Sequence, residues 1–392
     1  MTTASSVVSP PADRFDGRQF TEESAAALRE LLSSGNYAAA LSLPMPGRTN
    51  PLNEVILRSG FLRGAVNAWD ESRYHDSYRT KLARAKGKSP VILYDLLWLH
   101  KPVPEATLHS IATPKIIDSL LASSLLVSKN GMIYATARCF SFRSRQFLFD
   151  YDRSQSDFVF FGTDSFIMPR FINGLLPNRH FARVLDLCTG SGVQGIFLSA
   201  QADQTTCADI NPRAVSLVRA NAVLNNARNV NALQTNMFSN VEGTFDCITA
   251  NTPYRPMPGD SGVSDLPLRG GDLGIEFTLE LVRALVDRLR DNGVSILYTS
   301  DPVVNGRPVL LEEVKKVLGS RNFDVAEYLL FRSYTDEPYL LDHFRRLKIS
   351  GYDDCLLVLR KDQPARYTRK VWHPSFYWRT YLRAALQRRH FA

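Results

Sequence analysis

The fold of this chain is decided by the stretch VLDLCTGSG at residues 184–192. Its first four residues have the apolar pattern of a buried strand, and its last five form a loop of small residues. Residues 193–200 continue with a helix pattern, and residues 208–210 form a second short strand that contains Asp209. The order strand, glycine turn, helix, strand and acid is typical of one half of a doubly wound nucleotide-binding sheet.

The glycines of this loop have a physical function. Glycine permits a tight strand-to-helix turn and lets a ligand approach the backbone closely. Gly190, Gly192 and Gly195 satisfy the pattern G-x-G-x-x-G, and Asp209 lies at about the distance of a ribose-binding acid. That pattern also fits a dinucleotide enzyme. Asp186 argues against such an enzyme, because dinucleotide strands usually stay apolar up to the glycines.

Four segments together resemble the class I S-adenosylmethionine-dependent methyltransferases. Residues 186–192 (DLCTGSG) are similar to the first motif of that family. Residues 251–254 (NTPY) are similar to the Asn-Pro-Pro-Tyr motif of its amino-methylating branch, which includes release-factor glutamine methyltransferases and adenine-amine methyltransferases. Residues 268–274 (LRGGDLG) and 164–170 (DSFIMPR) resemble segments downstream and upstream of that motif in the glutamine enzymes. The resemblance covers residues 160 to 304, approximately.

The resemblance implies an α/β fold, namely a Rossmann-like class I methyltransferase domain with a seven-stranded sheet whose last strand is inserted antiparallel. Apolar patterns place these strands at residues 184–187, 208–210, 229–233, 246–250, 294–298, 326–331 and 354–359. Three positions depart from the family pattern. Cys188 stands where glycine is commonest, Thr252 replaces the first proline, and Asn236 stands where an acid often meets the adenine amine.

The same resemblance implies S-adenosyl-L-methionine as the cofactor. Asp186 would help to hold the ammonium group of this zwitterionic ligand or order a water beside it. The residues expected to bind the cofactor are Asp186, Thr189, Gly190, Gly192, Asp209, Ile210, Asn236, Met237 and Asn251.

Asn251, Pro253 and Tyr254 are the expected catalytic residues. Methyl transfer from a sulfonium is a direct displacement, so the protein must hold a nucleophile in line with the methyl group. An amide or aromatic amine is a poor nucleophile because its lone pair is delocalised. Accepting its N–H on the side-chain oxygen of Asn251 would orient the nitrogen and favour a transition state in which positive charge grows there. Pro253 would fix the backbone, and Tyr254 would offer its face to a planar group.

Length and composition predict a cytoplasmic protein of two domains. The 392 residues exceed a usual single domain, and contents of 44% hydrophobic and 22% charged residues are ordinary for a soluble globular protein. No run of 18 apolar residues predicts a membrane span, and residues 1–13 lack the pattern of a secretory signal. The five cysteines form no C-x-x-C pair and the seven histidines have no ligand spacing, so neither a disulfide framework nor a metal site is expected.

Residues 16–152 are expected to form a helical, winged-helix-like domain. A helix begins after Thr21 and ends at Gly35, and Asn130-Gly131 predicts a hairpin. Further helices are expected at residues 51–69, 91–100, 105–111 and 114–126, and a strand at residues 140–149. The helix at residues 114–126 carries only Lys115 as a base, so a structural or substrate-capping role is favoured over DNA reading.

Three other regions complete the predicted organisation. Residues 1–15 are expected to be a disordered tail, residues 153–362 the methyltransferase domain, and residues 363–392 a basic, aromatic extension. The net charge of +8 lies entirely in the last 33 residues, where nine Lys or Arg face one acid. The helical spacing of residues 375–386 favours docking on the protein over nucleic-acid binding.

The leading hypothesis is a methyltransferase acting on a nitrogen of a protein side chain or a small metabolite. An RNA or DNA amine methyltransferase is the first alternative, using the basic tail for phosphate. A natural-product enzyme methylating oxygen or carbon is the second, because Thr252 leaves the acceptor open. A dinucleotide enzyme is a more distant alternative.

Overall fold

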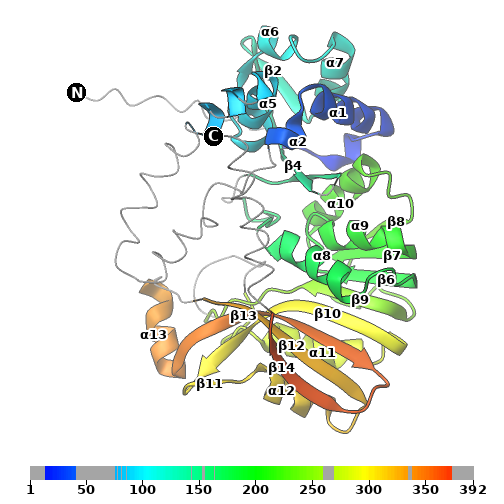
Figure 1. The fold of residues 1–392 in the computed structure, drawn as a ribbon, viewed down its shortest axis with the longest axis vertical. Coiled ribbons are helices and arrows are strands. Elements are labelled where there is room, and N and C mark those ends of the chain that lie inside the picture. Colours follow the sequence, from blue (N-terminus) through cyan, green and yellow to red (C-terminus); the bar gives the residue numbers. More distant parts are fainter. Residues whose placement is uncertain are drawn as a thin grey trace. The chain divides into compact units, whose positions relative to one another are not determined.

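The computed structural model describes residues 14–40, 76–258, 269–333 and 338–372, except for residues 77, 81, 85, 143, 152–154 and 163. The chain falls into two compact units, one reaching to Tyr151 and the other running from Asp152 to Trp372 (Figure 1). Of the predicted elements, the helix at residues 51–69 and the docked segment at residues 375–386 lie outside the described residues.

The second unit is built on one mixed sheet. Its strands are β6 (Phe181–Leu187), β7 (Ala202–Asp209), β8 (Val230–Gln234), β9 (Phe245–Asn251), β10 (Leu289–Val304), β11 (Arg307–Pro308), β12 (Phe323–Ser333), β13 (Ile349–Lys361) and β14 (Arg366–Val371). They follow the order β14-β12-β13-β10-β9-β6-β7-β8, with β11 paired to β10. Strands β6 to β10 run parallel, and β13 is antiparallel to both β10 and β12, as the resemblance implied.

The predicted count of seven strands is too low for this sheet. Among the described residues the sheet has nine strands, because β11 and β14 add to the seven that were expected. Strand β14 lies in the segment that the sequence indicated as a tail, and it pairs parallel with β12 from Arg366 to Val371. Three of its six residues are Lys or Arg, and this basic composition conceals the apolar pattern by which strands are recognised.

Helices cover both faces of this sheet (Figure 1). The helices are α8 (Asp164–Leu175), α9 (Val193–Leu198) with a 3-10 turn at Ser199–Gln201, α10 (Pro212–Leu224), α11 (Glu276–Leu285), α12 (Leu310–Leu318) and α13 (Pro338–Leu347). Leu185 and Leu187 of β6 share a buried core with α11 and α12. Asp186 points to the opposite face, where its carboxylate accepts from the N–H of Gly195 in α9. Successive side chains of β6 therefore point to opposite faces of the sheet. One face packs against the apolar core with α11 and α12, and the other faces α9, which follows the glycine loop.

The first α-helix described in the first unit is α1 (Glu22–Ser34), which has the predicted ends. The Thr21 hydroxyl accepts from the N–H of Ser24, and Gly35 caps the last turn. The other elements are a 3-10 turn (Gly17–Gln19), α2 (Tyr37–Ala40), α5 (Ser89–Leu93), a π-helical turn η2 (Tyr94–Trp98), β1 (Val103–Pro104), α6 (Glu105–Leu108), α7 (Pro114–Ala122), β2 (Leu126–Lys129), β3 (Met132–Ala135), β4 (Arg138–Phe142) and β5 (Arg145–Phe149).

Two hairpins end the first unit. Strands β1, β3 and β2 form one small sheet, and Asn130 and Gly131 both have positive φ in the β2–β3 turn, as the predicted hairpin requires. The single strand predicted at residues 140–149 is instead a second hairpin of β4 and β5. Among the described helices of either unit, none has the length and apolarity needed to cross a membrane.

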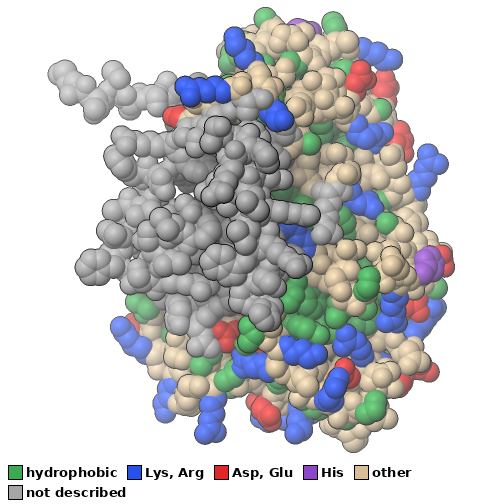
Figure 2. Space-filling model, viewed as in Figure 1, with side chains coloured by type: hydrophobic (Ala, Val, Ile, Leu, Met, Phe, Trp, Pro, Cys, Tyr) green, Lys and Arg blue, Asp and Glu red, His purple; other side chains and the backbone are tan. Residues whose placement is uncertain are grey.

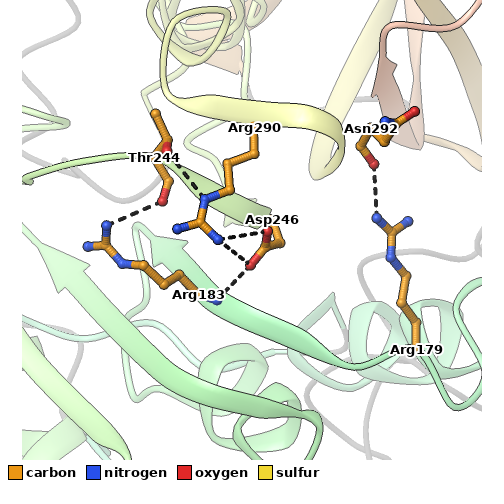
Figure 3. A network of polar contacts seen from close by, with 6 residues as sticks. All are labelled: Arg179, Arg183, Thr244, Asp246, Arg290 and Asn292. Atoms are coloured by element: carbon orange, nitrogen blue, oxygen red, sulfur yellow. Dashed lines mark hydrogen bonds and ion pairs between the residues drawn. The ribbon is translucent and has the colours of Figure 1, made fainter.

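Arginines close the edge of the large sheet at which the parallel strands begin (Figure 3). The Asp246 carboxylate accepts from the backbone N–H of Arg183 at 2.7 Å and from the Arg290 guanidinium at 3.1 Å. The Arg183 side chain donates to the carbonyl of Thr244, and Arg179 donates to the carbonyl of Asn292. These bonds join β6, β9 and β10 at one end.

A buried ionic cluster joins β14 to strands β10, β12 and β13. Arg369 of β14 lies 3.1 Å from both Asp301 and Asp353 and 3.4 Å from Glu327. All three acids are at most 5% exposed. Desolvation by burial raises the pKa of Glu327, and its neighbour Asp301 raises it further, so Glu327 binds a proton at neutral pH. On the face drawn in Figure 2, basic and acidic side chains stand close together over β12 and β14.

Candidate functional site

A cavity of about 470 Å³ lies at the carboxyl ends of the parallel strands. Strand β6 has β7 on one side and β9 on the other, so the chain order reverses at this point of the sheet. Ligands of open α/β sheets bind at such a reversal, and the volume lies in the usual range for a ligand pocket. The predicted site residues that line it are Thr189, Gly190, Asp209, Ile210, Asn236, Met237, Asn251, Pro253 and Tyr254.

Asp186 lies behind the glycine loop and does not line the cavity. Its Oδ2 accepts from the Thr189 hydroxyl at 2.5 Å and from the Gly195 N–H at 3.1 Å, and its Oδ1 accepts from the Thr249 hydroxyl at 2.8 Å. The side chain is fully buried, and desolvation raises the pKa of Asp186 to about 6. These three bonds brace the loop, and the contact of Asp186 with a ligand stays a prediction.

Two other loop residues have conformational roles. Gly192 also lies outside the cavity lining, and its φ of +83° provides the left-handed turn that starts α9. Cys188 lines the cavity with a φ of +50°, a conformation that favours glycine. This explains why glycine is commonest at that position in the family that the sequence resembles. Burial raises the pKa of the Cys188 thiol, which therefore stays protonated.

Asp209 joins the glycine loop to the end of β7. Its Oδ2 accepts from the N–H of Gly190 at 2.9 Å, and its Oδ1 accepts from the N–H of Asn211 at 3.0 Å. A carboxylate offers about four lone-pair sites, so these two bonds leave capacity for hydroxyl donors. Burial raises the pKa of Asp209 above its usual value. The exposed Ile210 follows at the border of the cavity.

The side-chain carboxamide of Asn251 has a hydrogen-bond partner for its NH2 group and, among the described residues, none for its oxygen. Its Nδ2 donates to Oδ2 of Asp164 at 2.9 Å. Its Oδ1 is buried, and among the described residues it has no hydrogen-bond partner. A buried acceptor without a partner costs about 1–3 kcal/mol, so this atom is an unusual feature beside a cavity.

The hydroxyl and the backbone N–H of Thr252 form hydrogen bonds within the fold. Its hydroxyl and its backbone N–H both donate to the carbonyl of Tyr298, at 2.8 and 3.1 Å. The hydroxyl also lies 3.2 Å from that of Thr278. Proline has no N–H and could not make the backbone bond. Thr252 lines the cavity, but its hydroxyl is engaged with the carbonyl of Tyr298 and is not presented to an acceptor as a free group.

A second glycine segment clamps the backbone of Tyr254. A Cβ on Gly270 would lie 2.8 Å from the Tyr254 Cα, and one on Gly274 would lie 2.6 Å from the Tyr254 carbonyl oxygen. That carbonyl accepts from the Ser300 hydroxyl at 2.6 Å. Desolvation by burial raises the pKa of the Tyr254 phenol, so it remains neutral. The close approach of the two backbones explains the glycines of the segment at residues 268–274.

Sequence reasoning missed several residues that border the cavity. They include Phe160, Asp164, Ser165, Cys188, Thr235, Arg269, Phe277 and Leu281. Asp164 and Arg269 lie in segments that the resemblance singled out, but neither was chosen as a site residue. In the described parts of the chain, no three His, Cys, Asp or Glu side chains gather in a way that could hold a metal ion.

The sheet order, the antiparallel insertion of β13 and the cavity beside the glycine loop define a class I methyltransferase fold. Residues 169–261 match the family described as "Methyltransferase small domain". The resemblance predicted from the sequence is therefore confirmed.

Curated relatives belong to the amino-methylating branch. A protein of Methanocaldococcus jannaschii, provisionally named as a protein N5-glutamine methyltransferase, is 34% identical over 122 residues, which cover 30% of this chain and 61% of that protein. The release factor glutamine methyltransferase of Deinococcus radiodurans is 30% identical over 34% of this chain and 50% of its own length. The ribosomal protein uL3 glutamine methyltransferase of Xanthomonas campestris pv. campestris is 31% identical over 31% and 42%. The chain thus spans 42% to 61% of the length of these relatives.

Proposed function

We propose that this chain is an S-adenosylmethionine-dependent methyltransferase that methylates a side-chain amide nitrogen of a protein. The observation that carries the proposal is the buried, unpartnered Oδ1 of Asn251 beside the cavity. A donor N–H of an acceptor amide would satisfy this oxygen. The names of the relatives, which specify glutamine in release factors and in uL3, support an amide acceptor.

The donor set around the cavity fits the proposed cofactor. S-adenosylmethionine would supply a methyl group on a sulfonium centre. Asp209 would accept from ribose hydroxyls with the lone pairs that its backbone bonds leave free. Gly190 would let the ligand approach the loop, and Asn236 and Met237 would border the adenine. Asp186 would act through the loop that it braces.

Asn251 would orient the acceptor and stabilise the developing charge. Its Oδ1 would accept an N–H of the amide and turn the nitrogen lone pair toward the methyl group. As the bond forms, positive charge grows on that nitrogen, and the interaction with Oδ1 strengthens. The proton can leave to water afterwards, so no protein base is required. Pro253 would hold the backbone, and Tyr254 would lie against the planar amide.

Oxygen acceptors suit this arrangement less well. A hydroxyl must lose its proton to become a good nucleophile, and an amide oxygen is not a base. The amide oxygen of Asn251 can orient an acceptor N–H but cannot take a proton from a hydroxyl, and this favours nitrogen over oxygen.

A nucleic-acid acceptor draws little support from the basic C-terminal region. Within the described residues, Arg360 and Arg366 pair with Asp324, and Arg369 pairs with the buried cluster. These charges are therefore engaged with acids of the fold. Lys361 lies 3.7 Å from Asp291, and Lys370 donates to the Tyr328 hydroxyl at 3.4 Å. The other four basic residues, Arg379, Arg383, Arg388 and Arg389, lie outside the described residues.

We further infer that the first unit is winged-helix-like. The order α5, β1, α6, α7, β2, β3 and the antiparallel β1-β3-β2 sheet support this. Helix α7 carries one base, Lys115, and its buried residues Ile116, Ile117 and Leu120 serve packing. A role in presenting the protein substrate suits this helix better than DNA reading.

Methyl-labelled S-adenosylmethionine tests the proposal. The purified chain should transfer label to release factors or to uL3 of the source organism, and mass spectrometry should place one methyl group on a glutamine. Total RNA of the same organism provides the competing acceptor, and Asn251→Ala provides the inactive control. Label in RNA, or label in protein that survives Asn251→Ala, would contradict the proposal.

A further inference from the structure

Asn251 can serve the proposed reaction only if its oxygen, and not its NH2 group, faces the acceptor. The carboxamide is nearly symmetric in shape, and a rotation of its end exchanges a donor for an acceptor. With the NH2 group turned to the acceptor, the site would repel an amide N–H. Some other group must therefore fix the orientation.

We propose that Asp164 is the positioning residue that fixes the carboxamide of Asn251. Its Oδ2 accepts from Nδ2 of Asn251 at 2.9 Å, and a carboxylate can only accept. The rotated amide would place Oδ1 of Asn251 against this carboxylate, which is a repulsive arrangement. The pair therefore leaves Oδ1 as the open group, in agreement with its lack of a partner among the described residues.

Asp164 is itself held in place by the segment that precedes α8. It is the first residue of α8 and 5% exposed, and its Oδ1 accepts from the N–H of Ser165 at 2.9 Å. A Cβ on Gly162 would lie 2.8 Å from this Oδ1 and 2.6 Å from Cζ of Phe160. A side chain at position 162 would therefore displace the Phe160 ring or the Asp164 carboxylate from its place at the cavity. Burial raises the pKa of Asp164 above its usual value, while the hydrogen bonds from Asn251 and Ser165 and the helix N-terminus favour the charged carboxylate.

A purely structural role for Asp164 predicts a different outcome. As an N-terminal helix residue, it would contribute to stability, and its loss would lower the melting temperature without a selective effect on turnover. As a positioning residue, it would act only through Asn251. A double-mutant cycle separates the two roles, because a residue that acts through another has no further effect once that other is gone.

Asp164→Asn is the decisive variant because it keeps the shape and allows the wrong amide orientation. In the wild-type background, we expect kcat for the glutamine acceptor to fall by about 10- to 100-fold, with KM changing less. In the Asn251→Ala background, the same change should alter kcat by less than about twofold. Asp246→Asn, a carboxylate change at the opposite edge of the sheet, is the matched control and should leave kcat unchanged.

A nuclear magnetic resonance measurement on the full chain tests the contact without catalysis. The kinetic arm rests on the proposed function, whereas the side-chain amide signals of ¹⁵N-labelled asparagine do not. The Asn251 signal, assigned by its loss in Asn251→Ala, should shift strongly in Asp164→Asn and remain in place in Asp246→Asn. An unshifted signal would overturn the inference, as would full turnover by Asp164→Asn. A shifted signal in a chain that methylates no protein would retain the contact and refute the proposed function.

Discussion

The two edges of the large sheet differ in how they treat polar groups. At the edge where the parallel strands begin, Asp246 accepts from Arg183 and Arg290, and the side chains of Arg179 and Arg183 donate to backbone carbonyls (Figure 3). At the edge where they end, the Oδ1 of Asn251 is buried without a partner in the described part of the chain. Because unpaired buried groups are costly, the difference indicates that the second edge is completed by ligands. The first edge holds the strands together, and the second would perform the chemistry.

The largest effect that would test this comparison is expected for Asn251→Ala. The residue would contact the acceptor and the developing charge, so turnover should fall by about 10²- to 10³-fold. Cofactor affinity should remain within about twofold, because the proposed contact is to the acceptor. Steady-state kinetics with the labelled cofactor, together with calorimetry, measure both quantities. Parallel losses of binding and turnover would mean that Asn251 is a structural residue of the turn.

The second largest effect is expected on the affinity for the cofactor. Asp209→Ala removes the acceptors proposed for the ribose and also the bond that holds Gly190. We expect binding of S-adenosylmethionine to weaken by about 1.5–3 kcal/mol, as is usual for hydrogen bonds to a charged group. Calorimetry measures this change, and NAD should give no binding to the wild-type chain. Tight binding of NAD with none of the sulfonium would refute the cofactor assignment.

The third effect, on the free energy of unfolding, is expected for Asp186, whose carboxylate lies behind the glycine loop. Burial raises the pKa of Asp186 from 3.8 to about 6, so the folded chain binds a proton here that the unfolded chain releases. The stability contributed by this group is present below pH 4 and is lost as the pH rises to 6. Asp186→Asn should therefore gain stability relative to wild type across that window, by about 3 kcal/mol, and the difference should level off above it. Urea unfolding at several pH values measures it, and a pH-independent difference would contradict the assigned cause.

The sequence predicts local features of this fold well and long-range contacts poorly. The ends of α1 depend on Thr21 and Gly35, and the β2–β3 turn depends on Asn130 and Gly131, so neighbouring residues suffice to predict them. The glycine loop at residues 188–192 is predicted for the same reason. No pattern within residues 184–192 reveals on which side of the loop the Asp186 carboxylate lies, since this depends on Thr249 in β9.

Contacts between distant segments explain the other differences between the structure predicted from the sequence and the observed one. Arg369 in β14 reaches Asp301 and Glu327, which lie 68 and 42 residues earlier, so the local pattern indicated a basic tail and concealed a strand. Asp164 and Asn251 are separated by 87 positions, and neither residue alone indicates the other. The unpartnered Oδ1 of Asn251 can be recognised only from the structure, in which the segments of Asp164 and Asn251 both line the cavity.

The smallest effect is expected at the edge where the strands begin. Asp246→Asn keeps an oxygen for the N–H of Arg183 but removes the charge opposite Arg290, whose side chain is 38% exposed. Solvent screens such a pair, so unfolding should become easier by about 0.5–1 kcal/mol. Cofactor affinity and turnover should be unchanged, because the bonds of Asp246 reach only β6, β9 and β10. Urea unfolding measures the first quantity, and the methyl-transfer assay measures the second. A loss of cofactor affinity as large as that of Asp209→Ala would mean that the two edges are energetically coupled, and the division between a binding edge and a structural edge would then be wrong.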